Sequence, residues 1–238
     1  MKKKLIVNAD DFGLSPGVNK GIVEAYLNGS LSSTTLMVNQ PYAEHAVELY
    51  QNYSNLGLGI HLTFDKGKSL FGVSSLTDSE GNFKRYKLLL ESGRKEDFIR
   101  EIEAQIFRFE ELCGKMPTHM DSHHHIHIRI KEAFEAIQVI SRKYNLKYRK
   151  NDELIGEFYE DNVSLSNFYS LIDTKDTEVI EFMCHPAIVD TTLLETSSYS
   201  YKREEELKIL TSSEVKNYVK DRYILMSYDG KIKNNVNY

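Results

Sequence analysis

The sequence predicts an α/β fold: a single domain over residues 1–238 that forms one irregular (β/α) barrel, TIM-like and either complete or incomplete. Short apolar strand candidates alternate with amphipathic helices, an order typical of a mostly parallel sheet. Polar residues able to do chemistry follow several of these strands. In a β/α barrel the carboxyl ends of the strands meet on one face, whereas an open sheet gathers fewer of them. The pattern therefore favours the barrel.

The first part of the chain predicts three strands and two helices. Residues 4–10 form a short buried strand. Ser15 and Pro16 then give a helix a hydroxyl cap and a proline at its first position, and that helix ends near Gly29. The elements that follow are a strand at 33–39, a helix at 41–53 and a strand at 56–64.

The middle and the end of the chain continue the alternation. Residues 65–95 carry four glycines and little periodicity, so we expect a long irregular insertion there, of the kind that is usually functional or mobile. Glu204–Glu206 is interpreted as a solvated helix face. The other expected elements are a helix around 99–109, a strand and loop at 118–127, a helix around 134–144, and strands at 146–149, 178–184 and 223–227.

Composition excludes several classes of protein. A net charge of −5 gives no basic surface, so we expect no nucleic-acid partner. No segment is long and apolar enough to span a membrane, and the lysines at 2–4 are not followed by the apolar region of a signal peptide. The two cysteines, Cys113 and Cys184, form no CxxC pattern, which suits a reduced, cytoplasmic protein. The oligomeric state stays open, with a homodimer among the alternatives.

The densest chemical signal is the segment 119–127, which holds five of the eight histidines. Neutral imidazole binds divalent transition metals. In an extended segment residues 119, 121, 123, 125 and 127 point to the same side, so several nitrogens and a carboxylate would face one site. Five histidines cannot all bind one ion, and some are expected to orient a ligand or a substrate. The plainer alternative is a solvated polar loop.

Further candidates follow other strands. Asp10 and Asp11 end the first strand; in isolation such a pair more often serves a turn, but a bound cation would relieve their repulsion. His61 lies among apolar strand residues, where a histidine is usually a hydrogen-bonded part of the core. His185 precedes Pro186, which ends its strand and holds the imidazole at the rim.

Four motifs together resemble the YdjC-like carbohydrate deacetylases, and most closely their chitooligosaccharide-deacetylating branch. They are Leu5–Ser15 (LIVNADDFGLS), the strand GIHL at 59–62, Thr118–His127 (THMDSHHHIH) and Cys184–Ala187 (CHPA), in the family's order. The resemblance implies a β/α-barrel enzyme with a divalent metal, usually described as magnesium. It also implies an acetylated amino sugar as substrate, such as chitobiose or its 6-phosphate.

Carried over residue by residue, the resemblance assigns Asp11, His61 and His125 to the metal. It assigns Asp10 to the general base, although the two aspartates could exchange roles. We expect His185 to protonate the departing amine. A donor set of two nitrogens and one oxygen suits Zn²⁺, Co²⁺ or Mn²⁺ better than Mg²⁺, so the ion stays open. Residues expected to contact the substrate or to support the site are Asn39, Asp121, His123, His127 and Arg149.

Two rival functions fit part of the pattern. Another barrel metal hydrolase, such as a phosphoesterase or a cyclic amidohydrolase, also places histidines after strands. A non-catalytic sugar- or metal-binding protein is the second rival. Asp10 and His185 argue against it, because simple binding needs neither a spare base nor an acid.

Overall fold

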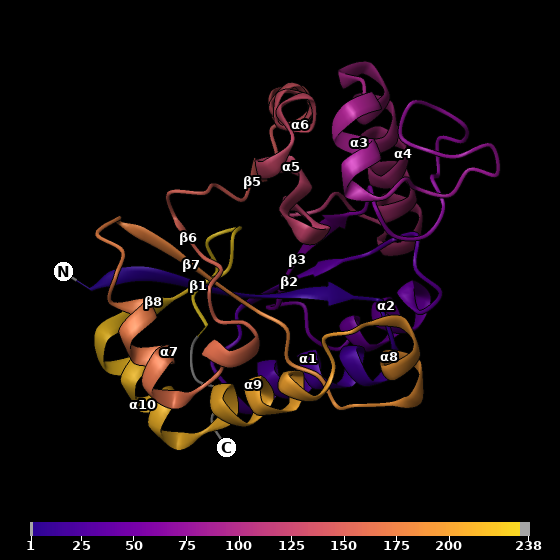
Figure 1. Ribbon diagram of the computed structural model, residues 1–238. Helices are drawn as coiled ribbons and strands as arrows, with labels where there is room; N and C mark the ends of the chain where they lie inside the picture. Colours follow the sequence, from indigo (N-terminus) through magenta and orange to yellow (C-terminus); the bar gives the residue numbers. More distant parts are fainter. Residues whose placement is uncertain (1, 234–238) are drawn as a thin grey trace.

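The computed structural model describes residues 2–233, and its centre is one curled sheet of parallel strands (Figure 1). The strand order is β5–β4–β3–β2–β1–β7–β6, and β8 pairs with β1. Within residues 2–233 no ladder joins β5 to β6, so the predicted barrel is confirmed in its incomplete form, as a half-barrel. The strands are β1 (Lys3–Phe12), β2 (Ser33–Leu36), β3 (Gly57–Leu62), β4 (His119–Ser122), β5 (Lys147–Tyr148), β6 (Leu154–Ile155), β7 (Val179–Cys184) and β8 (Tyr223–Leu225).

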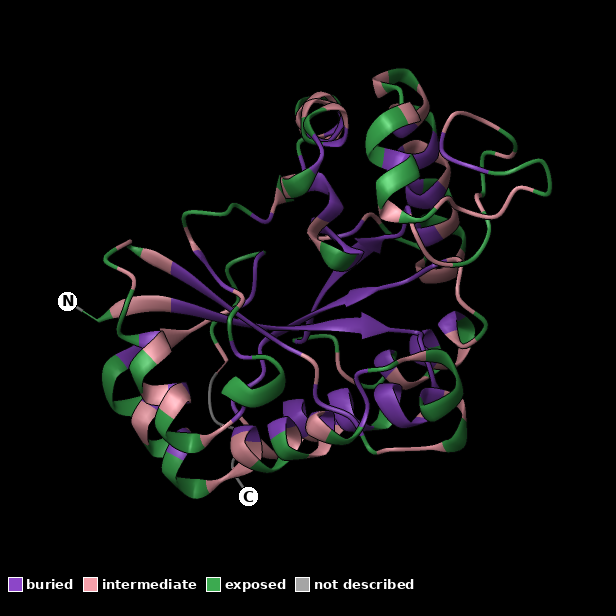
Figure 2. Ribbon diagram, in the orientation of Figure 1, coloured by how far each residue is buried: buried purple, intermediate pink, exposed green. Residues whose placement is uncertain are grey.

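Strand β1 is the axis of the sheet because it pairs with three others. Strand β7 follows one edge of β1 over residues 4–9, while β8 and β2 share the other edge, at residues 3–5 and 8–12. From Leu5 onward every residue of β1 is buried (Figure 2). Burial on both faces explains the continuous apolar run at the start of this strand.

Helices surround the sheet and shield it from solvent. Figure 1 shows α3 to α6 gathered at one end, with α1, α2 and α7 to α10 along the other side. Helix α1 packs against α9, and α4 against α6. No helix within residues 2–233 is both long and apolar enough to cross a membrane. The helices are α1 (Pro16–Asn28), α2 (Ala43–Tyr50), α3 (Tyr86–Ser92), α4 (Lys95–Cys113), α5 (Ile126–Arg129), α6 (Lys131–Tyr144), α7 (Leu165–Ile172), α8 (Thr191–Thr196), α9 (Tyr201–Thr211) and α10 (Ser213–Arg222).

The predicted helix start at Ser15 is confirmed: its hydroxyl accepts the backbone N–H of Val18 at 3.1 Å, and Pro16 is the first helical residue. Expected strands and helices appear in their predicted places but are mostly shorter. The sequence analysis missed β6, α7, α8 and α10. A two-residue strand and helices of six to ten residues carry too few apolar positions to show a period.

The segment 65–95 is only partly irregular, because its last part forms α3. Its earlier part is tied to helix α4 by Glu101, a buried carboxylate. This side chain accepts the backbone N–H groups of Leu70 and Phe71, each at 3.1 Å, and the hydroxyl of Ser69. These three donors and Nε2 of Gln105, at 2.8 Å, together compensate one buried charge, which fixes the beginning of the segment against α4.

Candidate metal and catalytic site

The carboxyl ends of four strands bring the candidate residues together. Asp10 and Asp11 lie near the end of β1, His61 in β3 and Asp121 in β4, while His185 follows β7 directly. In the sheet His61 is the register partner of Asp121. The structure thus gathers at one edge the side chains that the sequence placed after separate strands, as parallel pairing requires.

Asp10 is held by a buried arginine. Nη1 and Nη2 of Arg149 donate to the two Asp10 oxygens at 2.8 and 2.7 Å. The same guanidinium contacts Asp121 and Glu181, each at 2.8 Å. Burial alone would raise the pKa of Asp10, but the Arg149 cation outweighs it and holds that pKa far below its usual range. Asp10 is therefore an ionised carboxylate.

The position of Arg149 decides between the two roles expected from the sequence, contact with the substrate and support of the site. The structure buries its side chain completely, against carboxylates of the protein itself. Arg149 does not line the pocket; it orients the Asp10 carboxylate and keeps it ionised.

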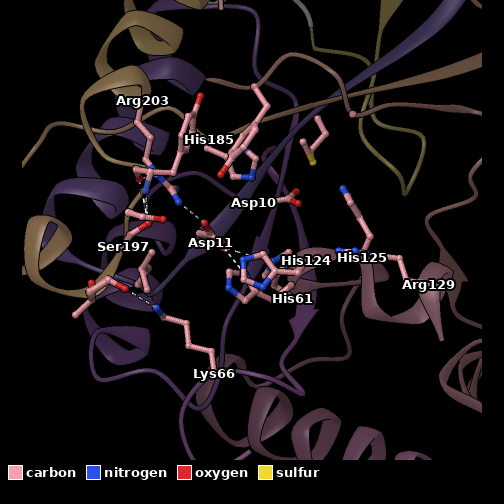
Figure 3. Close-up of a pocket in the computed structure, with 18 residues that line it drawn as sticks. Asp10, Asp11, His61, Lys66, His124, His125, Arg129, His185, Ser197 and Arg203 are labelled. Carbon is pink, nitrogen blue, oxygen red and sulfur yellow. Dashed lines mark hydrogen bonds and ion pairs between the residues drawn. The ribbon is translucent and has the colours of Figure 1, made fainter. Parts of the chain in front are cut away.

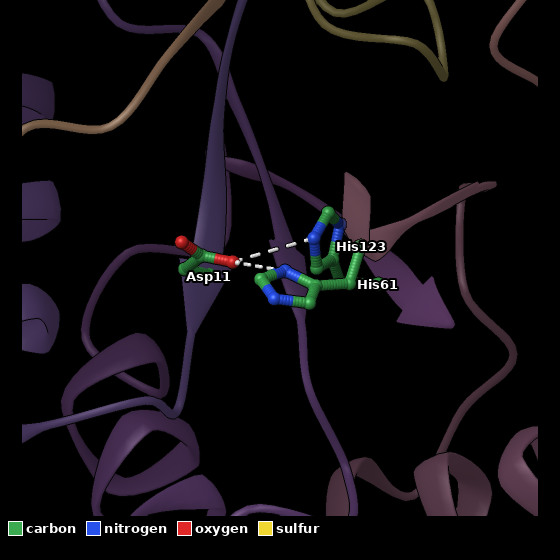
Figure 4. A group of neighbouring side chains, drawn as sticks. All are labelled: Asp11, His61 and His123. Atoms are coloured by element: carbon green, nitrogen blue, oxygen red, sulfur yellow. Dashed lines mark hydrogen bonds and ion pairs between the residues drawn. The ribbon is translucent and has the colours of Figure 1, made fainter. Parts of the chain in front are cut away.

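Asp11 faces the imidazoles of His61 and His123 (Figure 4) and a second arginine, Arg203 (Figure 3). Its Oδ1 lies 3.4 Å from Nε2 of His61 and 3.2 Å from Nδ1 of His123. Its Oδ2 accepts Nη2 of Arg203 at 2.7 Å. Burial would raise the pKa of Asp11, but Arg203 and the histidines hold it well below its usual value. A carboxylate oxygen and two imidazole nitrogens thus converge on one point.

These three donors fit a divalent metal. Their ligand atoms lie within 4.8 Å of one another. Ligand atoms about 2.0–2.2 Å from a shared ion are themselves separated by roughly 3.0–3.5 Å, close to the Asp11 separations. Nδ1 of His61 bonds to Asp121 at 2.6 Å, which leaves Nε2 to face Asp11. A carboxylate behind a ligating histidine is the usual support of such a site.

The structure brings His123, and not His125, to Asp11 and His61. The expectation of an extended 119–127 segment is wrong beyond Ser122, where β4 ends. His124 and His125 have φ values of 51° and 56°, so the chain turns and the alternation of sides is lost. His125 lines the same pocket, with its buried Nδ1 making no hydrogen bond. Burial lowers the pKa of His125 to about 3. Its role as a ligand stays a prediction.

The remaining predicted residues support the site from behind or lie beside it. His127 is buried and links Ser122, at 2.6 Å, to the backbone oxygen of Arg149, at 3.2 Å. Asn39 donates to the backbone oxygens of Lys66 and Lys68, both at 3.1 Å. Asn39 therefore anchors the start of the 65–95 segment and is not among the pocket-lining residues.

His185 stands on the opposite side of Asp10 from the other histidines (Figure 3). Its side chain is 13% exposed and its ring packs edge-on against Tyr159 and Tyr199. Glu206 lies behind it, fully buried. The interpretation of residues 204–206 as a solvated face is thus wrong for Glu206, because α9 turns this one residue toward the sheet.

A cavity of about 350 Å³ joins these groups, within the range of small-molecule sites. Sequence reasoning missed several residues around it, notably Arg203 and Tyr199. Arg203 sits in an acidic run, and no local pattern indicates that it reaches Asp11. The lining residues include Asp10, Asp11, His61, Lys66, His123, His124, His125, Arg129, Tyr159, His185, Tyr199 and Arg203.

Two relatives show which proteins this chain is similar to in sequence. A carbohydrate deacetylase of Geobacillus stearothermophilus is 42% identical over 223 residues, covering 89% of this chain and 90% of the relative. A chitooligosaccharide deacetylase of Yersinia pestis (strain Pestoides F) is 36% identical over 246 residues, covering 93% and 96%.

Solved structures share the fold. A proposed cellobiose-phosphate cleavage protein of Enterococcus faecalis V583 superposes with a TM-score of 0.89 at 33% identity, covering 96% of this chain and 98% of that one. A CE4 esterase of Streptococcus mutans has a TM-score of 0.62 at 14% identity, covering 95% and 86%, a likeness of fold alone. The family model described as "YdjC-like protein" matches residues 4–221. The chain therefore belongs to the YdjC-like family.

Proposed function

We propose that this protein is a divalent-metal-dependent hydrolase that removes N-acetyl groups from acetylated amino sugars. The observation that carries the proposal is the placement of Asp10. This ionised carboxylate lines the same cavity as His185 and the Asp11–His61–His123 group, and Figure 3 shows Asp10, Asp11, His61 and His185 around that cavity. A base, an acid and a metal-binding group around one cavity suit hydrolysis of an amide. The names of relatives at 36–43% identity support a carbohydrate substrate.

Asp11, His61 and His123 would hold the cation. When bound there, a divalent ion supplies Lewis acidity toward water and toward the acetyl carbonyl oxygen. Asp121 holds the His61 ring in the required orientation, and Arg203 occupies the other oxygen of Asp11. Two nitrogens and one oxygen suit Zn²⁺, Co²⁺ or Mn²⁺, whereas Mg²⁺ prefers oxygen ligands. The proposal covers a divalent metal and leaves its identity to experiment.

Asp10 and His185 would move the protons. Asp10 accepts a proton from water as the water oxygen bonds to the acetyl carbon, and Arg149 keeps the carboxylate ionised for that step. His185 then donates a proton to the amide nitrogen as the C–N bond breaks. The products are acetate and a free amino sugar. Tyr159 is exposed and lines the cavity, so its ring offers an aromatic surface on which a sugar ring can pack.

Acetate release tests the proposal directly. N,N′-diacetylchitobiose and its 6-phosphate are given to metal-stripped protein, and to protein resupplied with Mg²⁺, Zn²⁺, Co²⁺ or Mn²⁺. We expect metal-dependent acetate release that is lost in His123→Ala. The matched control is His45→Ala on α2, a histidine outside the pocket, which should behave as wild type. Folded, metal-loaded protein that releases no acetate from either sugar would overturn the proposal.

A further inference from the structure

Glu206 is a buried carboxylate that the proposed chemistry does not yet use. It lies on α9 between neighbours that are exposed or half-buried, yet its own side chain has no exposed surface. Its oxygens accept the backbone N–H of His185 and the hydroxyl of Tyr199. Burial and the Glu206 charge both raise the pKa of the Tyr199 hydroxyl, so the phenol remains a neutral donor.

The His185 ring faces this carboxylate without bonding to it. Its Nδ1 lies 3.8 Å from Oε1 of Glu206, is buried, and has no hydrogen-bond partner. A buried carboxylate is stable only when opposite charge or hydrogen bonds compensate it. A protonated imidazole at this position supplies both, and catalytic hydrogen bonds are often longer before substrate binds.

The nearby arginine does not compensate Glu206. Arg203, one turn earlier on α9, has its Nη2 on Asp11 and its Nε on the backbone oxygen of Tyr199. Among residues 2–233, His185 supplies the basic side-chain nitrogen that lies within 4.0 Å of the Glu206 oxygens. Neither arginine of the site forms an ion pair with Glu206, although Nη1 of Arg203 is buried without a hydrogen-bond partner.

We propose that Glu206 is a positioning residue that holds Nδ1–H of His185 and favours its imidazolium form, so that Nε2 can protonate the sugar nitrogen. This inference rests on the proposed deacetylase function. Glu206 stays ionised throughout. The proton leaves Nε2 as the C–N bond breaks, and the ring regains a proton from solvent in the next turnover. Tyr199 donates its hydroxyl to Oε1, the same carboxylate oxygen that His185 Nδ1 faces, and so helps to hold the carboxylate in place.

A plainer role for Glu206 is to anchor the turn after β7 through the His185 backbone N–H. The two roles differ in their dependence on the leaving group. An amine must be protonated to leave, whereas 4-nitrophenolate leaves unprotonated. Loss of proton donation by the acid therefore slows hydrolysis of the amide but not of an activated ester, whereas a distorted site slows hydrolysis of both.

The experiment compares Glu206→Gln with wild type on N,N′-diacetylchitobiose and on 4-nitrophenyl acetate. For each substrate, the hydrolysis rate measured with Asp10→Asn is subtracted from the other rates as background. We expect kcat for the amide to fall about 10- to 100-fold, with KM within about twofold, while ester kcat/KM falls less than about threefold. Glu205→Gln, the same change at an exposed position one residue away, should leave both rates unchanged. Equal losses on amide and ester would overturn the positioning role.

A second variant covers the case in which Glu206→Gln does not fold. Tyr199→Phe removes one hydrogen bond to Glu206 and leaves the Glu206 charge in place. It should lower kcat for the amide by a smaller factor, about threefold, and leave the ester rate unchanged. A wild-type enzyme that hydrolyses neither substrate refutes the deacetylase function itself, and the inference with it. A wild type that cleaves the amide, with variants that lose both rates equally, refutes the inference alone.

Discussion

Replacing Arg149 with methionine removes the cation that keeps the Asp10 carboxylate ionised. The guanidinium bonds to Asp10 at 2.7 and 2.8 Å and to Asp121 and Glu181 at 2.8 Å, with no exposed surface. Methionine fills similar space but removes the buried cation that these three carboxylates share. Breaking a buried ion pair in this way costs about 3–5 kcal/mol of unfolding free energy. Burial then raises the pKa of Asp10 against the weaker opposition of His61 and His185.

Urea denaturation and a pH–rate profile check both consequences. In wild type the lowered pKa of Asp10 contributes stability that is present above about pH 4 and is lost as the pH falls. In Arg149→Met the pKa of Asp10 is higher than in wild type, so this pH-dependent contribution is smaller and the stability difference from wild type should narrow toward low pH. The acidic limb of kcat/KM should move to higher pH, because the base now ionises later.

The control is Arg142→Met, the same substitution on the exposed face of α6, which should change stability by less than about 0.5 kcal/mol. Arg149→Met with wild-type stability and an unmoved acidic limb would refute the reasoning. In that case Asp10 would have to be held ionised by another group, and the contacts of Arg149 would be structural only.

Three further predictions concern the metal group and the strand beneath it. His123→Ala should abolish stoichiometric Co²⁺ binding in calorimetry while His125→Ala retains it; the opposite pattern would restore the assignment made from the sequence. Burial lowers the pKa of His61, but Asp121 and Asp10 raise it, to about 10. A cation must displace the proton from His61, so cation affinity should rise up to about tenfold per pH unit between pH 6 and 9. Cation binding that does not depend on pH would exclude His61 as a ligand. Gly59→Ala places a Cβ 2.4 Å from the buried His119 ring, so it should cost about 1–3 kcal/mol in urea denaturation, and a neutral effect would show that the ring can move.

The edge at which the site forms could be predicted from the sequence, for a simple physical reason. A strand buried on both faces is an apolar run, and the first polar residue after it marks the carboxyl end of that strand. Asp10 lies near the end of β1, two residues after the polar Asn8, and His185 directly follows β7, which pairs with β1 in the sheet. Parallel pairing alone then brings them to one edge.

The contacts within the site could not be predicted in the same way. Arg149 and Arg203 reach the aspartates from 139 and 192 residues away, and no local period encodes such pairs. Glu206 differs from its two acidic neighbours only in which side of α9 it occupies. The choice between His123 and His125 depends on the left-handed turn at 124–125, which an alternating pattern does not contain.

The two neighbouring aspartates are kept distinct by two different arginines. Adjacent carboxylates repel, and the sequence alone suggested a cation as the remedy. In the structure Arg149 compensates Asp10, and Arg203 compensates one oxygen of Asp11. Asp10 has both oxygens bonded to a cation of the protein, whereas Asp11 keeps Oδ1 directed at His61 and His123. This difference supports the proposal that Asp10 is the base and Asp11 the metal ligand.

Isosteric variants test that assignment, because asparagine keeps the shape and removes the charge. Asp10→Asn should bind Co²⁺ or Zn²⁺ within about threefold of wild type and lose about 10²- to 10⁴-fold in kcat, the usual worth of a general base. Asp11→Asn should lose at least about tenfold in cation affinity, and activity with it. Calorimetry and acetate release separate the two effects. If Asp10→Asn lost the cation and Asp11→Asn kept it, the roles would be exchanged, and Arg149 would be bonded to a ligand and not to the base.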